Sequence, residues 1–136
     1  MDKQLIGEKL ESLRKCIKRI EQKCPDKLEI IENDLDIQDI VSVNLTRAIQ
    51  VCVDIAAHIV SESDLNVPDT MAELFEDLEQ LKILNHQTVQ NMKSAVGFRN
   101  IAVHNYDKIN WLIVFKICKE NLDDFKKFAK AINDIV

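Results

Sequence analysis

Glycine and proline are scarce in this chain, which has two of each among its 136 residues. Because these residues mark most tight turns, their scarcity predicts few turns and long regular elements. No apolar run approaches the length of roughly 18 residues that a membrane-spanning helix requires. The first residues, Met-Asp-Lys-Gln-Leu-Ile-Gly-Glu, also lack the form of a signal peptide. We therefore expect a cytoplasmic protein with no membrane partner.

Cysteine motifs and an excess of positive charge are absent as well. The four cysteines are scattered and form no Cys-x-x-Cys pair, which argues against zinc and thioredoxin-like sites and is typical of reduced cytosolic thiols. The 18 basic residues face 23 acidic ones, and the formal net charge is −5. Because non-specific nucleic-acid binding depends on cations that neutralise phosphates, any contact with RNA must be local or be built by assembling subunits.

The overall composition is typical of a globular protein. Hydrophobic residues make up 46% of the sequence and charged residues 30%. A length of 136 residues is enough to bury a substantial core and falls within the usual size of one domain. We therefore expect a single helical domain over residues 1–136.

Apolar residues recur at helical spacing in the first half of the chain. One apolar seam predicts a helix over residues 2–24, which Pro25 ends. A second helix, over residues 36–62, carries two apolar stripes. The first stripe consists of Val41, Leu45, Ala48, Cys52, Ile55 and Ile59, and the second of Ile49, Val53, Ala56 and Val60. A helix that is apolar on two sides either lies at the centre of a bundle or buries its second side on another subunit.

Two shorter helices follow a loop that contains Pro68. The first is predicted over residues 70–84 and begins with a capping box, in which Thr70 caps the helix and Glu73 reaches back. After a turn, Thr88 is expected to cap the next helix. The apolar stripe of that helix consists of Val89, Met92 and Val96.

The last helix is predicted over residues 109–135. Its apolar positions alternate in steps of four and three: Trp111, Phe115, Cys118, Leu122, Phe125, Ala129, Ile132 and Val136. No segment shows the period of two that marks a strand. The predicted fold class is therefore all-α, an up-and-down bundle of about five helices with short connections.

One octapeptide, residues 99–106, concentrates the polar chemistry of the chain. It reads Arg-Asn-Ile-Ala-Val-His-Asn-Tyr and places three functional side chains at an Arg-x4-His-x-Tyr spacing. The guanidinium of Arg99 is always charged and can hold a phosphate, and the imidazole of His104 can move a proton near neutral pH. Metal-free phosphodiester chemistry needs these two groups.

On a helical wheel, polar residues of the octapeptide replace the apolar stripe of their own helix. Arg99, Asn100 and His104 fall on or beside the face that Met92 and Val96 occupy. Polar groups on a face that should be buried need partners or a purpose. A wet cleft between elements, or between two chains, would supply both.

The end of this helix sets the surroundings of the three polar residues. His104 lies near the expected helix end, where the helix dipole favours an imidazolium. Asn100 precedes it by one turn and is placed either to hydrogen-bond the imidazole in support of the site or to cap the helix end. Tyr106 falls outside the regular helix, and we expect its hydroxyl to be accessible.

Several segments resemble one family, the HepT-type HEPN toxins of HepT/MntA type VII toxin–antitoxin pairs. The family signature resembles residues 97–106, Gly-Phe-Arg-Asn-Ile-Ala-Val-His-Asn-Tyr. Its second helix is similar to residues 44–50, Asn-Leu-Thr-Arg-Ala-Ile-Gln, and to residues 53–59, Val-Asp-Ile-Ala-Ala-His-Ile. Its next segment resembles residues 67–75, Val-Pro-Asp-Thr-Met-Ala-Glu-Leu-Phe. The resemblance spans nearly the whole chain, in the expected order.

This resemblance implies a metal-independent endoribonuclease whose composite active site forms across a homodimer. By carry-over, Arg99 and His104 are the catalytic pair, and Asn100 is the supporting polar residue. Tyr106 matches the tyrosine that the partner antitoxin MntA, a minimal nucleotidyltransferase, modifies with AMP, which implies a neutralising O-AMP-tyrosine. The implied partners are an RNA substrate, a second copy of the chain and an MntA-like antitoxin, and no cofactor is implied.

Other functions stay open at this level. A non-catalytic subunit that docks a nucleotidyltransferase and holds nucleotide or substrate would share the fold and the partner, and a structural dimeric bundle is a third alternative. The intact Arg-x4-His pair favours the enzyme, because a pure binding module has no need of a proton-transfer residue beside the arginine. His58, one turn after Asp54, suggests either a second acid–base pair or a histidine satisfied in the core or at an interface.

Overall fold

The structure is a computed structural model that describes all residues from 1 to 136. Its elements in chain order are α1 (Lys3–Lys23), α2 (Leu28–Asn33), α3 (Leu35–Ser61), α4 (Met71–Gln80), α5 (His86–His104), a 3-10 turn (Tyr106–Lys108), α6 (Trp111–Lys116), a π-helical turn (Ile117–Asn121) and α7 (Leu122–Ile135). No strand is present, and the predicted all-α class is confirmed.

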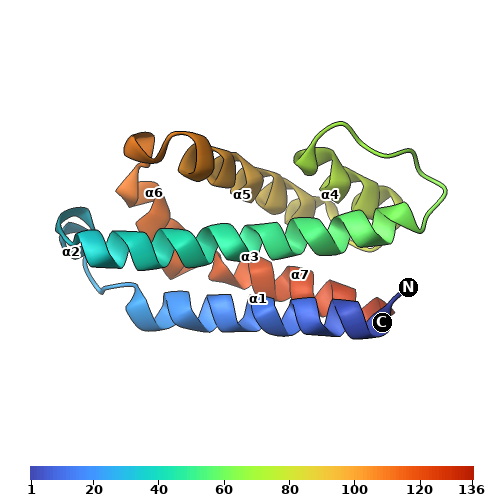
Figure 1. The fold of residues 1–136 in the computed structure, drawn as a ribbon, viewed down its shortest axis with the longest axis horizontal. Coiled ribbons are helices and arrows are strands. Elements are labelled where there is room, and N and C mark those ends of the chain that lie inside the picture. The colour runs from blue at the N-terminus through green and yellow to red at the C-terminus, as the bar shows by residue number, and fades with distance from the viewer.

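The long helix α3 lies at the centre of the bundle. Figure 1 shows α1 antiparallel to α3 on one side and α4 and α5 on the other, with both chain termini at the same end. Every residue of the two apolar stripes predicted for this helix is buried. The second stripe is therefore covered within the chain, and the central position is confirmed over the alternative of an interface with another subunit.

By length and composition alone, α3 could cross a membrane. One window of 18 residues has a mean hydropathy of 1.4, although no uninterrupted apolar run is that long. Half of that window is buried inside the bundle. Because a central helix must be apolar on several sides, we interpret this hydropathy as that of a core helix.

Aspartates cap the two longest N-terminal helices. The carboxylate of Asp2 accepts a hydrogen bond from the backbone nitrogen of Leu5 at 3.0 Å and so begins α1. The carboxylate of Asp34 accepts from the backbone nitrogen of Ile37 at 3.1 Å and so begins α3. These bonds satisfy backbone donors that a helix start leaves without an internal partner.

The short helix α2 was not predicted, because six residues are too few to display an apolar period. The buried side chain of Gln38 joins it to α3. Its amide nitrogen donates to the backbone carbonyl oxygens of Ile31 at 2.8 Å and of Glu32 at 3.2 Å. The amide thereby satisfies the open carbonyl end of α2 while it stays out of water.

The start of α4 matches its predicted cap in part. The hydroxyl of Thr70 accepts from the backbone nitrogen of Glu73 at 3.3 Å. The carboxylate of Glu73 reaches back one residue further than expected, to the backbone nitrogen of Asp69 at 3.2 Å. The helix ends at Gln80 instead of near residue 84, because Lys82 adopts the left-handed conformation (φ 63°) of a helix-ending turn.

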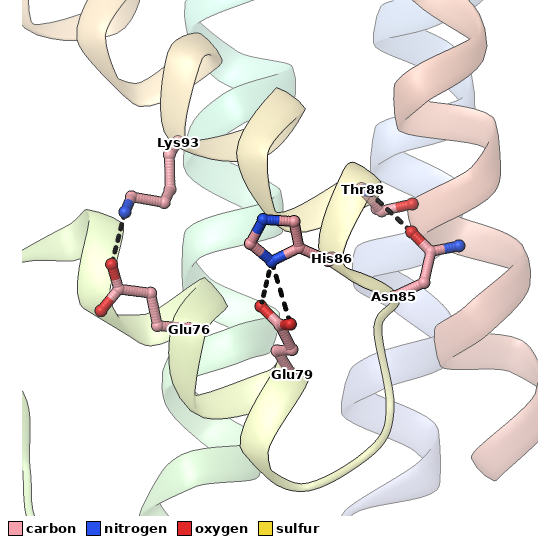
Figure 2. Close-up of polar contacts among 6 residues, drawn as sticks. All are labelled: Glu76, Glu79, Asn85, His86, Thr88 and Lys93. Carbon is pink, nitrogen blue, oxygen red and sulfur yellow. Dashed lines mark hydrogen bonds and ion pairs between the residues drawn. The ribbon is translucent and has the colours of Figure 1, made fainter.

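Asn85, and not Thr88, caps α5. The side-chain oxygen of Asn85 accepts from the backbone nitrogen of Thr88 at 2.8 Å, as Figure 2 shows. The expectation that Thr88 would be the cap was therefore wrong by three residues, since Asn and Thr are both good N-cap residues. Figure 2 also shows His86 against Glu79, with Nδ1 at 3.1 Å from Oε2, and Lys93 paired with Glu76. These contacts connect α4 to α5.

The helix predicted over residues 109–135 is interrupted. A π-helical turn at Ile117–Asn121 separates α6 from α7. Such a turn has more residues per turn than an α-helix and rotates the positions on either side of it. As a result Val114 is fully buried, while Trp111 and Phe115 are only partly buried. Cys118 within the π-helical turn, and Leu122, Phe125 and Ile132 after it, are buried at positions expected to be apolar.

Candidate functional site

The octapeptide lies at the C-terminal end of α5 and in the turn that follows. His104 is the last residue of the helix, and the backbone nitrogen of Asn105 closes it by donating to the carbonyl oxygen of Ile101 at 2.8 Å. Tyr106 opens the short 3-10 turn that leads to α6. The predictions that His104 lies at the helix end and that Tyr106 lies outside regular α-helix are both confirmed.

The face of α5 that carries the motif changes from core to surface along the helix. Met92 and Val96 are buried, whereas Val103, on the same face, is 48% exposed. His104 is exposed and Arg99 is partly buried. The motif therefore runs from a partly buried Arg99 to an exposed His104, because the last turn of α5 extends past the part of the core that covers its earlier turns.

The side chain of Arg99 is partly buried and forms no ion pair with a carboxylate. Its Nη1 donates to the side-chain oxygen of Asn100 at 3.3 Å, and its Nε is buried with no hydrogen-bond acceptor. Because no carboxylate pairs with the guanidinium, its charge is available to an oxyanion. Asn100 contacts Arg99, and the suggested hydrogen bond from Asn100 to His104 is not formed.

The hydroxyl of Tyr106 is held by two side chains of α3. It donates to Oδ1 of Asp39 at 2.8 Å and accepts from Oγ of Ser42 at 3.4 Å. The ring packs edge-to-face on Trp111, with the centroids 6.0 Å apart, and the residue is 39% exposed. Burial raises the pKa of Tyr106; the hydrogen bond from Ser42 opposes this rise, and Asp39 adds to it.

Sequence reasoning missed Asp39 and Ser42. They precede Tyr106 by 67 and 64 residues, so no local spacing connects them to it. The one signal available was their own pattern, two polar residues three apart on a helix that is otherwise mostly apolar. Tyr106 is partly exposed, and its hydroxyl, which the sequence predicts to be accessible, is hydrogen-bonded.

The suggested second acid–base pair is not formed. Nε2 of His58 accepts from the backbone nitrogen of Asp2 at 3.4 Å and lies 3.3 Å from a carboxylate oxygen of Glu62. Asp54 instead accepts from the side chains of Gln50 at 2.9 Å and Lys9 at 3.2 Å. His58, in the last turn of α3, is thus a satisfied histidine that contacts the N-terminal segment of the chain. No cluster of three or more His, Cys, Asp or Glu side chains has the arrangement of a metal site.

Comparisons with known proteins agree on one family. A family model described as ribonuclease HepT-like matches residues 13–132. The chain is 36% identical over 128 residues to the mRNA nuclease HepT of Shewanella oneidensis, with 94% of this chain and 96% of the relative covered. It is 29% identical over 97 residues to the tRNA nuclease HepT of Aphanizomenon flos-aquae, with 71% of this chain and 66% of the relative covered.

A solved structure is similar over the whole chain. It contains the tri-AMPylated HEPN toxin of Shewanella oneidensis in complex with its MNT antitoxin. The toxin is 35% identical to this chain and matches it with a TM-score of 0.90, covering 98% of this chain and 99% of the toxin. With the helix order, the Arg-x4-His-x-Tyr segment and these relatives in agreement, the chain belongs to the HepT-like ribonuclease family.

Proposed function

We propose that this protein is the toxin of a toxin–antitoxin pair and acts as a metal-independent endoribonuclease through Arg99 and His104, with Asn100 in support. The observation that carries this proposal is the geometry of α5: a guanidinium without a carboxylate partner precedes an exposed imidazole by five residues at the helix end. The relatives, which are named mRNA nuclease and tRNA nuclease, support RNA as the substrate class.

RNA supplies its own nucleophile, the 2′-hydroxyl. In the proposed reaction that hydroxyl loses a proton, attacks the adjacent phosphorus and displaces the 5′-oxygen, which gains a proton. The guanidinium of Arg99 stabilises the charge that develops on the phosphate. The imidazole of His104 acts as base or acid, a contribution of about 10²–10⁴-fold.

One motif histidine per chain is too few for separate acid and base roles, which favours a site shared by two chains. Exposed apolar side chains within the octapeptide support this: Ile101 and Val103, in the last turn of α5, are 47% and 48% exposed. We therefore propose a homodimer whose interface includes this end of α5 and brings two copies of His104 to one RNA strand.

The catalytic roles are tested with Arg99→Ala and His104→Ala chains in buffer that contains a chelator. Each substitution should lower the rate of RNA cleavage by about 10²-fold or more, while the matched exposed change Gln90→Ala on α5 leaves the rate unchanged. Expression of the wild-type chain alone should arrest growth, and His104→Ala should relieve the arrest. Undiminished cleavage by both variants would exclude this mechanism and favour a non-catalytic binding subunit.

Modification of Tyr106 is the proposed means of neutralisation. The solved relative is a tri-AMPylated toxin bound to its antitoxin, and Tyr106 is the one tyrosine of this chain. We propose that an MntA-like nucleotidyltransferase attaches AMP to its hydroxyl. Coexpression with that enzyme should raise the mass of the chain by one or more AMP units and abolish cleavage. A Tyr106→Phe chain that still gains AMP would show that the acceptor lies elsewhere.

We propose that residues 1–136 act as one unit in the cytoplasm. The 30 apolar residues of the buried core form one cluster to which α1, α3, α4, α5 and α7 all contribute. The four cysteines are unpaired, which suits a reducing compartment. RNA of the kinds that the relatives cleave is found there as well.

A further inference from the structure

The proposed acceptor hydroxyl already has a carboxylate in place to receive its proton. The oxygen of Tyr106 donates to Oδ1 of Asp39 at 2.8 Å, the length of a good O–H···O hydrogen bond. The hydroxyl of Ser42, which also lies 3.3 Å from the backbone oxygen of Asp39, donates toward the same phenolic oxygen at 3.4 Å, and the ring packs edge-to-face on Trp111. The remaining exposure of Tyr106 leaves a side open to an incoming reagent.

We propose that Asp39 is a catalytic residue of the modification, which this chain supplies to its own modifying enzyme. This inference rests on the proposed acceptor role of Tyr106. The tyrosine oxygen attacks the α-phosphorus of a nucleoside triphosphate and forms a new oxygen–phosphorus bond. The bond from that phosphorus to the oxygen bridging to the β-phosphate breaks, and pyrophosphate leaves. The phenolic proton passes to Oδ1 of Asp39 during the attack.

A base is needed because the free tyrosinate is rare at neutral pH. An ordinary tyrosine has a pKa of about 10, and burial raises the pKa of Tyr106 above that value. Asp39 is the one charged group that acts on the hydroxyl, since the side chains of Ser42 and Trp111 are neutral. A carboxylate within hydrogen-bond reach meets the geometric condition for a general base.

The test uses purified antitoxin and ATP, with the rate of AMP addition measured from pH 6 to 9. Asp39→Asn keeps the shape of the side chain and removes the base. The rate should fall by about 10²-fold or more at neutral pH and should rise about tenfold per pH unit, because only the tyrosinate fraction then reacts. The wild-type chain should show a flat profile, and Asp39→Glu, which keeps a carboxylate, should also be flat.

Asp36→Asn is the matched control, since Asp36 is an exposed aspartate on the same helix with no side-chain partner, and its rate should equal that of the wild type. Helical content and thermal unfolding confirm that each variant is folded. A rate for Asp39→Asn that equals the wild-type rate, or that is lower by the same factor at every pH, overturns the role of Asp39 as base. AMP on a Tyr106→Phe chain overturns the proposed acceptor instead, so the two failures are distinct.

An independent observation concerns a groove of about 580 Å³ between α1 and α3. Three cations line it: Lys15 and Arg19 of α1, and Arg47 of α3. All three are exposed and none forms an ion pair, although the whole chain carries a net charge of −5. Burial raises the pKa of the Cys16 thiol, which also lines the groove, and the positive charge of Arg47 opposes this rise.

The groove is connected to Tyr106 through Asp39. Asp39 lines the groove and its Oδ1 accepts the hydrogen bond from Tyr106, and Arg47 lies eight residues, or about 12 Å, further along α3. We infer that the three cations bind phosphates of the RNA strand on which the proposed ribonuclease acts, an inference that rests on that proposed function. AMP on Tyr106 would place a phosphate beside this groove, where it competes with RNA for the same cations.

The groove is tested by binding of a fully 2′-O-methylated RNA oligonucleotide, which lacks the attacking hydroxyl, at increasing salt. A chain with Lys15→Gln, Arg19→Gln and Arg47→Gln should bind the RNA more weakly. Its salt slope, the slope of log binding constant against log salt concentration, should be smaller in magnitude by about two, because each phosphate contact on a single strand contributes about 0.7. The control is a Lys126→Gln, Lys127→Gln, Lys130→Gln chain, which changes the net charge by the same amount at exposed sites of α7. Its affinity for the RNA and its salt slope should change little.

An equal loss of RNA affinity in the two triple variants would show an effect of net charge only and would overturn the proposed RNA-binding role of the groove. Unchanged RNA binding by the groove variant together with lost antitoxin binding would also overturn the proposal, since the groove would then be a docking surface for protein. A wild-type chain that binds the methylated RNA through the groove but cleaves no unmodified RNA overturns the proposed ribonuclease alone.

Discussion

At the scale of single residues, the surroundings of Tyr106 set how readily its hydroxyl ionises. Burial raises the pKa of this tyrosine, the Ser42 hydroxyl opposes the rise, and the Asp39 carboxylate adds to it. Because the pKa is higher in the folded chain than in the unfolded one, the fold favours the neutral phenol. That contribution to stability is fully present below the unfolded pKa of about 10 and is lost as the pH rises through the folded pKa.

Alkaline titration tests this directly, since the chain has a single tyrosine and the near-ultraviolet absorbance of tyrosinate reports on it alone. The folded chain should titrate at a higher pH than the same chain in denaturant. Asp39→Asn should lower the folded midpoint, because it removes the negative charge beside the phenolate, and Asp36→Asn should leave it in place. Equal midpoints for the folded and denatured chains would contradict the burial of the hydroxyl.

At the scale of elements, the N-terminal half of α5 packs in the core and its C-terminal half carries the candidate site. Asn85 fixes the first turn of α5, and Val89 and Met92 bury the N-terminal half in the core. Its last turn continues the same helix beyond the core, which exposes His104, and Arg99 lies just before it and is partly buried. Because a helix is stiff, the capped and buried half positions the exposed half. Residues at the start of α5 therefore help to set where Arg99 and His104 lie.

The cap of α5 therefore makes a measurable contribution to stability. Asn85→Ala should lower the free energy of unfolding by about 1 kcal/mol, because it leaves the backbone nitrogen of Thr88 without its acceptor. Gln90→Ala, an exposed change on the same helix, should have an effect within about 0.5 kcal/mol. Denaturant unfolding measures both. If Thr88→Val lowered the free energy of unfolding and Asn85→Ala did not, Thr88 would be the N-cap residue.

At the scale of the whole molecule, the core and the motif occupy different parts of the bundle. One apolar cluster joins the long helices along their length, while apolar side chains at the end of α5 and on α6 stay exposed, Ile101, Val103 and Ile113 among them. Apolar surface that the chain does not cover itself is a candidate contact for a second chain. This arrangement is consistent with the proposed dimer and places its interface beside the motif.

Val103→Glu tests that interface. A charge within it should shift the chain from dimer to monomer in sedimentation and should lower RNA cleavage by about tenfold or more, because two copies of His104 no longer share one site. Val67→Glu adds the same charge at a residue of the loop between α3 and α4 that is 86% exposed, and it should change neither property. A Val103→Glu dimer with full activity would contradict the proposed interface.

Local patterns were enough to predict most of the helices and three polar residues of the candidate site. The apolar stripes of α1, α3 and α5 became buried faces as expected, because amphipathic periodicity depends on neighbours three or four residues away. The same local reasoning placed Arg99 and His104 on one helix and Tyr106 just after it. It was least accurate where one residue decides an end, as at Asn85 and Lys82.

Packing settled what local patterns left open. The second stripe of α3 is buried within the chain, and the π-helical turn rotates the last helix. The contact of Tyr106 with Asp39 joins residues 67 positions apart. No spacing in the chain encodes that distance, because it depends on how α3 packs beside the turn after α5, and such packing is fixed by the shape of the whole core.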